Sequence, residues 1–517
     1  MAEKEGFEPS IPFWGIHDFQ SCALDQLRDF SMKRTDFGRV EISLLIIHDI
    51  VKIVKWKSKN SFFREKGETG LRSPGKYDTL HPMKEGTLML CDNIEIRAGC
   101  LYFAGRSLRE LAEKYGTPLY LLDEDRIREN CRTYVRAMRE AFPRAMPLYA
   151  SKALSLKALY RIMAEEGMGI DVVSAGELYR AHAVGFPMER VHFHGSSKTD
   201  EEIALALSMG VGCFVVDGRD ELEALDRLAA KAGVRQRILL RLTPGIDPHT
   251  FAAVATGKVD SKFGTPIVTG QAEELLTAAL GKRNVEVRGY HCHVGSQVFE
   301  STVFLDAADI MLAFARDMEE KHGFFPETLD LGGGYGVRYV KTDPKVDLAA
   351  EIRSVGHHVA ARCRELGIRE PEILMEPGRS IVADAGMTLY TVEAVKSIPG
   401  YKSYVCVDGG MTDNPRYALY RSAYTVLSVD RPEAEPVGRF TIGGRCCESG
   451  DMLQENVVLP ALSRGDLLAV CTTGAYNHSM SSNYNSVPRP PMVGLSGGKD
   501  RLLLRRETYE DLLEREY

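Results

Sequence analysis

Lys152 ends the run Tyr149–Lys152 and is the first residue whose type and place suggest covalent chemistry. Most lysines are solvated surface charges, but a lysine at the end of a buried strand is surrounded by apolar residues. Burial disfavours the charged form, lowers the pKa of the amine and makes it a usable Schiff-base nucleophile. We therefore predict a catalytic, covalent role for Lys152.

A glycine run, Gly332–Gly334, is the second candidate. Such a run also fits a simple tight turn, but glycines let backbone N–H groups approach phosphate oxygens closely. Ser296 and Arg379 would supply further donors. A lysine nucleophile together with a phosphate cradle is the combination that pyridoxal 5'-phosphate (PLP) requires, so we expect that cofactor.

Glu376 opens the segment Glu376–Arg379 and is the third candidate. A carboxylate beside a pyridine nitrogen keeps that nitrogen protonated, and the ring then accepts electrons when a bond to Cα breaks. The alternative interpretation is an ion pair between Glu376 and Arg379.

His291 and His293 lie two residues apart, which puts both rings on one face of a strand. One interpretation is a metal site of the kind found in barrel hydrolases, with Asp171 or His194 as further ligands. The other is one ring stacking on a flat cofactor while the second supports it. Lys152 and the glycine run favour stacking, so we expect no metal.

Eight short β-rich runs must position these residues, and most of them are separated by segments with helical periodicity. Ser174 with Glu177, and Thr199 with Glu202, have capping-box spacing. Eight strands alternating with helices over about 265 residues are typical of a parallel (β/α)8 barrel of the TIM type. The runs are residues 147–151, 169–174, 191–195, 213–217, 238–243, 287–294, 328–331 and 372–375.

Polar or glycine residues lie toward or just after the carboxyl ends of all eight runs, and in such barrels the chemistry lies at the carboxyl ends of the strands. This clustering predicts a site for an anionic ligand at that end of the barrel. The residues are Lys152, Asp171, His194, Asp217, Arg241, His291 with His293, Gly332–Gly334, and Glu376 with Arg379.

After Ala385 short alternating runs at 388–395, 404–407, 439–442 and 467–471 predict a β domain, of sandwich or barrel type. The run Ile94–Phe103 has similar character and is expected to join that sheet. We therefore expect an N-terminal strand region over 83–117, the barrel over 118–384 and the β domain over 385–517.

Bulk properties agree with a cytoplasmic enzyme. A chain of 517 residues with 44% apolar and 26% charged residues suits two or three ordinary domains. A formal charge of −7 argues against nucleic acid as a partner. Eleven scattered cysteines without a CxxC pair indicate reduced thiols. The apolar run 42–54 is too short and too charged to span a bilayer.

Ordered motifs along the chain resemble those of the alanine-racemase-type (fold-type III) PLP decarboxylases, in particular the diaminopimelate decarboxylase family. The resemblance covers residues 86 to 517. It implies decarboxylation of meso-2,6-diaminopimelate to L-lysine, the last step of lysine biosynthesis. The motifs are 149–152, 291–297, 332–334, 376–379, 408–413, 447–451 and 474–476.

The resemblance also implies a role for each matching residue. Cys447 would return a proton after CO₂ leaves, and Glu448 would bind the distal ammonium group of the substrate. Because both reach the neighbouring subunit's site in this family, a homodimer with shared active sites is implied. The cofactor would be held by Lys152, Asp171, His293, Ser296, Gly333, Gly334, Glu376, Gly378, Arg379 and Tyr476. The substrate would be bound by Arg379, Arg416, Tyr420, Glu448 and Tyr476.

Three alternatives stay open. One is a sister decarboxylase acting on another D-configured, carrier-linked or basic amino acid such as ornithine, although those for ornithine usually carry Asp after the cysteine that matches Cys447. Another is a non-catalytic PLP-binding regulator, which would be expected to lose Lys152 or Cys447. The third is a metal-dependent hydrolase. Departures from the family at Leu154, within 194–198 and at Phe251 bear on the substrate more than on the chemistry.

Residues 1–82 carry no cofactor motif or clear periodicity, and Glu3, Glu5 and Glu8 argue against a signal or transit peptide. We expect a disordered extension or one outside the fold. A chain that begins at Met83 should therefore keep the cofactor content and CO₂ release of the full chain. Loss of solubility, or of half the activity, would show that this segment packs on the fold.

Overall fold

The computed structural model describes residues 90–246 and 259–517, and its central feature is a closed ring of parallel strands. The strands follow one another as β9-β11-β12-β13-β5-β6-β7-β8, and β8 also pairs with β9. The predicted barrel is confirmed, because each predicted run overlaps one strand. The strands are β5 (Ala145–Ala150), β6 (Gly169–Val172), β7 (Val191–Phe193), β8 (Cys213–Val216), β9 (Gln236–Thr243), β11 (Val285–His291), β12 (Thr328–Asp330) and β13 (Glu372–Met375).

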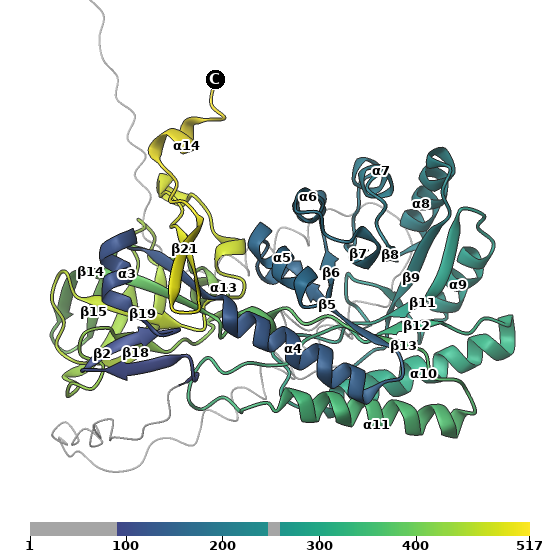
Figure 1. Cartoon of the computed structure of the whole chain (residues 1–517), viewed down its shortest axis with the longest axis horizontal. Coiled ribbons are helices and arrows are strands. Elements are labelled where there is room, and N and C mark those ends of the chain that lie inside the picture. The colour runs from purple at the N-terminus through teal and green to yellow at the C-terminus, as the bar shows by residue number, and fades with distance from the viewer. Residues whose placement is uncertain (1–89, 247–258) are drawn as a thin grey trace, which may run out of the picture. The chain divides into compact units, whose positions relative to one another are not determined.

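Helices lie outside these strands (Figure 1). Thr199 and Glu202 form the predicted capping box, in which each side chain accepts a backbone N–H of the other residue. Ser174 caps its helix by accepting from the N–H of Glu177, whose carboxylate turns to the N–H of Val173 instead. The helices are α4 (Glu124–Ala141), α5 (Lys157–Glu165), α6 (Ala175–Ala183), α7 (Asp200–Ser208), α8 (Arg219–Ala232), α9 (Gln271–Leu280), α10 (Thr302–His322), α11 (Leu348–Leu366) and α12 (Arg379–Val382).

Alternation along the strands separates two apolar layers. Outward-facing residues such as Phe214 and Leu240 belong to the large core shared with the helices. Their strand neighbours Val215 and Leu239 belong to a small separate cluster inside the barrel. Because side chains alternate along a strand, one set fills the barrel and the other holds the helices on it.

The residues after Ala385 form the predicted β domain, and its central strand β14 pairs with β15, β19 and β4. The four predicted runs are all strands. The strands of this sheet are β4 (Leu119–Asp123), β14 (Gly386–Ile398), β15 (Lys402–Val407), β16 (Val426–Ser428), β17 (Gly438–Gly443), β18 (Met452–Leu459), β19 (Leu467–Cys471), β20 (Met492–Ser496) and β21 (Lys499–Leu504). Short helices α13 (Arg416–Tyr420) and α14 (Tyr509–Leu513) accompany them.

The strand before the barrel that enters this sheet is β4, whereas Ile94–Phe103 does not. That run makes a hairpin, β1 (Ile94–Arg97) and β2 (Cys100–Phe103), in a separate three-stranded sheet with β3 (Arg106–Ser107). Helix α3 (Leu108–Tyr115) follows it. The hairpin contacts the β domain through apolar packing and through the N–H of Leu101 and the thiol of Cys100, which donate to backbone carbonyls there. β4 lies within the range expected for the barrel, 118–384, but it belongs to the β sheet. The first strand of the barrel is β5.

Within 90–246 and 259–517, no helix is long and apolar enough to cross a bilayer. The expected extension 1–82 and the departure at Phe251 lie outside the described residues.

Candidate active site

A cavity of about 510 Å³ lies where the barrel strands end and the β domain meets them. It brings the predicted strand-end residues together with predicted residues of the β domain. It is lined by Lys152, Val173, His194–Lys198, Arg241, Phe263, His291, His293, Ser296, Glu376, Arg379, Arg416, Tyr420, Tyr476 and Met480. Asp171 lies beside this cavity, whereas Asp217 holds the N–H of Gly264 at 3.0 Å and lies 3.8 Å from Arg241.

Two lysines line the cavity, and their contacts differ. The Nζ of Lys198 donates to Glu221 at 2.7 Å and to the carbonyls of Gly195 and Val215 at 2.9 Å each. All three of its hydrogens are therefore used, and its side chain is only 1% exposed. The Nζ of Lys152 lies 3.7 Å from Asp171, and its side chain is 41% exposed. Lys152 is the lysine placed to bind a ligand.

The expectation that Lys152 has a lowered pKa is wrong. Burial does lower the pKa of this amine, but Asp171, Tyr476 and Glu376 raise it by more, so the pKa lies above its ordinary value. The carboxylate of Asp171 stabilises the ammonium form. The reactivity predicted for Lys152 therefore has to come from its accessible Nζ and not from a lowered pKa.

Glu376 is held by two imidazoles and not by Arg379. Its Oε1 lies 3.0 Å from Nε2 of His194 and 3.3 Å from Nε2 of His291. All three side chains are buried, and the two rings meet edge to face at 5.0 Å. Although burial raises the pKa of Glu376, His194 and His291 lower it far more, so this carboxyl stays ionised.

The same three residues are the geometric basis for the metal alternative. His194, His291 and Glu376 each offer a ligand atom, and these atoms lie within 4.8 Å of one another. Asp171 lies 3.8 Å from His194. The sequence named Asp171, His194 and His291 as possible ligands, but not Glu376. The short N–O distances to Glu376 also fit imidazoles that stabilise its ionised form.

His293 lies just beyond the end of β11 and lines the cavity with His291. Its Nδ1 accepts the N–H of Gly333 at 3.3 Å. Burial and the nearby Lys152 hold the pKa of His293 well below its usual range. The ring is therefore a neutral imidazole, which suits stacking on a flat ligand.

The glycine run packs too closely on its neighbours to carry side chains. A Cβ on Gly333 would lie 2.0 Å from the carbonyl oxygen of Glu376, and one on Gly334 would lie 2.2 Å from that of Gly295. A Cβ on Gly378 would have more room, because its nearest neighbour, the Cβ of Ala150, would lie 3.0 Å away. The N–H of Gly333 is engaged by His293, whereas the N–H of Gly334 has no hydrogen-bond partner among the described residues.

Two buried guanidinium groups face this cavity without a carboxylate partner. Arg379 donates to Ser296 at 3.1 Å and to the hydroxyl of Tyr339 at 2.6 Å. Arg416 donates to Ser422 at 3.4 Å, and its Nε has no partner in the described part of the chain. Both are 7% exposed, and their Cζ atoms lie 4.9 and 5.4 Å from the Tyr476 ring. No described carboxylate lies within 4 Å of either group.

Cys447 and Glu448 do not line this cavity. Both are exposed on a turn of the β domain, so their own chain does not bring them to Lys152. Cys446 is half-buried, and burial together with Asp451 raises the pKa of its thiol to about 11.

Two residues that the sequence reasoning missed support the site. Tyr339 holds Arg379, and its position five residues after the glycine run was the available signal. Asp330, fully buried at the end of β12, accepts the N–H of Gly332 at 2.8 Å. Burial and Glu376 raise the pKa of Asp330 well above its ordinary value. No feature of the sequence indicated that Asp330, an acid within the predicted strand 328–331, would hold the glycine run.

Known proteins resemble this chain over most of its length. Residues 126–383 match the family described as pyridoxal-dependent decarboxylase, pyridoxal binding domain. The diaminopimelate decarboxylase of Bacillus subtilis is 43% identical over 416 residues, which are 80% of this chain and 95% of that protein. The one from Actinosynnema pretiosum subsp. auranticum is 46% identical over 424 residues, 81% and 93% of the two chains. The chain belongs to the diaminopimelate decarboxylase family.

Solved structures agree with this membership. The diaminopimelate decarboxylase of M. jannaschii in complex with L-lysine has a TM-score of 0.77 and 33% identity, covering 82% of this chain and 98% of that one. The lysine/ornithine decarboxylase of Vibrio vulnificus in complex with putrescine has a TM-score of 0.64 and 26% identity, covering 75% and 97%. The predicted family is therefore confirmed, and with it a PLP cofactor.

The cavity fits that cofactor. The accessible Nζ of Lys152 and an ionised carboxylate at Glu376 line one space. The N–H of Gly334 and the side chains of Ser296 and Arg379 are donors for a phosphate. These are the groups PLP needs, which favours PLP over a metal as the ligand beside Glu376.

Proposed function

We propose that this protein decarboxylates meso-2,6-diaminopimelate to L-lysine and CO₂ with PLP as cofactor, the last step of lysine biosynthesis. The observation that carries the proposal is the pair of buried guanidinium groups, Arg379 and Arg416, that line the same cavity as Lys152. Burying an unpaired charge costs several kcal/mol. The site therefore favours a ligand that brings at least two anionic groups, as a phosphate and a carboxylate do.

The reaction breaks the bond between Cα and its carboxylate, and a proton takes the place of the CO₂ that leaves. When bound, PLP would accept the electron pair left by that bond. Lys152 would hold the cofactor, and Glu376 would keep a proton on the ring nitrogen. The neutral ring of His293 would cover one face of the cofactor and exclude water from it.

Different residues would bind the two ends of the substrate. Arg379 and Arg416 offer paired N–H donors to carboxylates, while Tyr420 and Tyr476 flank them. Glu448 would contact the distal ammonium group from the partner subunit. Its exposed position outside its own cavity supports this arrangement.

We therefore propose a homodimer with shared active sites, in which Cys447 returns the proton to Cα of the substrate bound by the partner subunit. A cytoplasmic location remains part of this proposal, because the ten described cysteines form no disulfide.

The proposal is tested by measuring CO₂ release from meso-diaminopimelate, ornithine and D-lysine side by side. Release from diaminopimelate should be much the fastest. If ornithine is preferred, the chain is a sister decarboxylase. If no amino acid releases CO₂ although PLP is bound, the chain is a PLP-binding regulator.

Glu448→Gln tests the substrate more closely, because it removes the charge expected at the distal ammonium group. Losing one charged hydrogen bond costs about 1.5–3 kcal/mol. The specificity constant for diaminopimelate should therefore fall roughly tenfold to a few hundredfold. It should fall little for an amino acid without the distal group. Equal losses for both substrates would contradict this role of Glu448.

A further inference from the structure

The backbone at Cys447, on an exposed turn of the β domain, is held by an acceptor from a distant segment. The N–H of Cys447 donates to Oδ1 of Asn485 at 2.8 Å. Elsewhere the turn is tied to the segment 409–411, where the N–H of Met411 donates to the carboxylate of Asp451 at 2.6 Å. Among the described residues, Asn485 is thus what ties the backbone at the thiol residue itself to the neighbouring chain segment.

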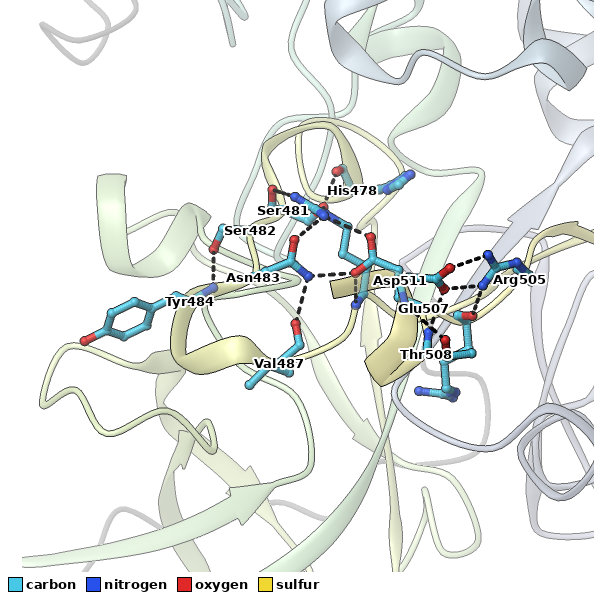
Figure 2. Close-up of polar contacts among 12 residues, drawn as sticks. His478, Ser481, Ser482, Asn483, Tyr484, Val487, Arg505, Glu507, Thr508 and Asp511 are labelled. Carbon is cyan, nitrogen blue, oxygen red and sulfur yellow. Dashed lines mark hydrogen bonds and ion pairs between the residues drawn. The ribbon is translucent and has the colours of Figure 1, made fainter. Parts of the chain in front are cut away.

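Asn485 belongs to a strap, residues 477–489, that is firmly held in place. Asn483 donates to Glu507 at 2.7 Å and to the carbonyl of Val487 at 3.0 Å (Figure 2). Arg489 pairs with Glu507 at 3.0 Å and donates to Oγ of Ser481 at 3.0 Å. The bonds to Glu507 tie the strap to the segment that follows β21. They fix both sides of the exposed tip that carries Asn485.

The backbone at the tip is itself unusual. Asn485 has φ 53° and ψ 25°, and Ser486 has φ 55°. Residues other than glycine rarely adopt this left-handed conformation, and Asn is among those that tolerate it best. The conformation turns the Asn485 side chain to the Cys447 turn and leaves the tip exposed beside it.

The strap also reaches the cavity of its own chain. Met480 lines that cavity, and the strap follows directly on Tyr476, which lies between the two guanidinium groups. One segment therefore contacts the substrate pocket at one end and fixes the backbone of Cys447 at the other.

We propose that Asn485 is a positioning residue that orients Cys447 for proton return in the partner subunit's site. This inference rests on the function proposed above, because it assumes that Cys447 is the proton donor. A donor displaced by about 1 Å can lose a factor of roughly 10² in rate. Asn485 would act on turnover and leave cofactor binding untouched, since neither it nor Cys447 is among the described residues that line the cavity.

The test uses the full chain with PLP and two glycine variants. N485G keeps a backbone suited to the left-handed region but removes the acceptor. S486G relaxes the next residue and keeps the acceptor, so it is the matched control. N485G should lower kcat roughly 10- to 100-fold, change KM less than about threefold and keep the PLP absorbance. S486G should retain turnover, and N485D, which keeps an acceptor oxygen, should recover most of it.

Two readouts separate positioning from general damage. In a Cys447→Ala background N485G should have no further effect, because coupled residues are non-additive. In the parent background it should speed hydrogen exchange of the Cys447 amide by about an order of magnitude, and N485D should not. The proposal is overturned if N485G keeps parental kcat, loses PLP or the dimer, or lowers turnover equally with Cys447 absent. If Cys447→Ala alone leaves turnover unchanged, it is the proton-donor role that fails, and the exchange data still test the Asn485 contact.

Discussion

Replacing Lys152 with alanine is expected to lower turnover by at least about 10⁴, since the loss of one nucleophile removes most of the rate enhancement of a catalytic unit. Lys152 is the cavity lysine whose Nζ is not consumed by other acceptors. The variant should fold, because this side chain is 41% exposed and fills no core position. Turnover is measured as CO₂ release, and folding by the thermal transition.

Lys198 provides the internal control for this expectation. Borohydride should fix the cofactor to a single peptide of the parent protein, and peptide mapping should place it on Lys152. Attachment to Lys198 would mean that the bonds to Glu221, Gly195 and Val215 open in the working enzyme. Lys152 would then not be the covalent residue.

Cys447→Ala is expected to lower turnover by roughly 10²–10⁴, the usual scale for removal of a general acid. A thiol that delivers a proton acts after the C–C bond breaks, so PLP binding and substrate affinity should stay nearly unchanged. Cys446→Ala is the matched control, because Cys446 is half-buried beside Asp451 and should be dispensable for turnover. Comparable losses in both variants would point to damage of the turn and not to proton transfer.

Mixing subunits tests where Cys447 acts. If each site takes its thiol from the partner, a heterodimer of Lys152→Ala and Cys447→Ala subunits contains one intact site. Activity should therefore return when the two inactive proteins exchange subunits. A mixture that stays inactive, with exchange shown by mass spectrometry of the dimers, would place Cys447 in its own subunit's site or outside catalysis.

Local pattern was enough to predict much of this molecule. The eight barrel strands follow from short apolar runs between helical segments, although several runs extend two or three residues past the observed strand end. Since barrels gather the carboxyl ends of their strands, residues as far apart as Lys152 and Glu376 were expected to share one site. The cavity contains both.

The strand pairings outside the barrel could not be predicted from the sequence and are known from the structure alone. The run Ile94–Phe103 and the strand β4 have similar apolar character, yet β4 enters the large sheet and the run forms a sheet of its own. Alternation reports that a strand is half-buried, but not which distant strand supplies its hydrogen bonds.

The electrostatics of the site were likewise beyond the sequence. Charge balance depends on which side chains meet in a buried space, and burial strengthens every such pair. Asp171 thus reverses the shift expected for the pKa of Lys152. Most of the groups at the end of the barrel could be read from strand patterns, but their pairing and ionisation depend on packing, because contacts between distant segments leave no periodic trace in the chain.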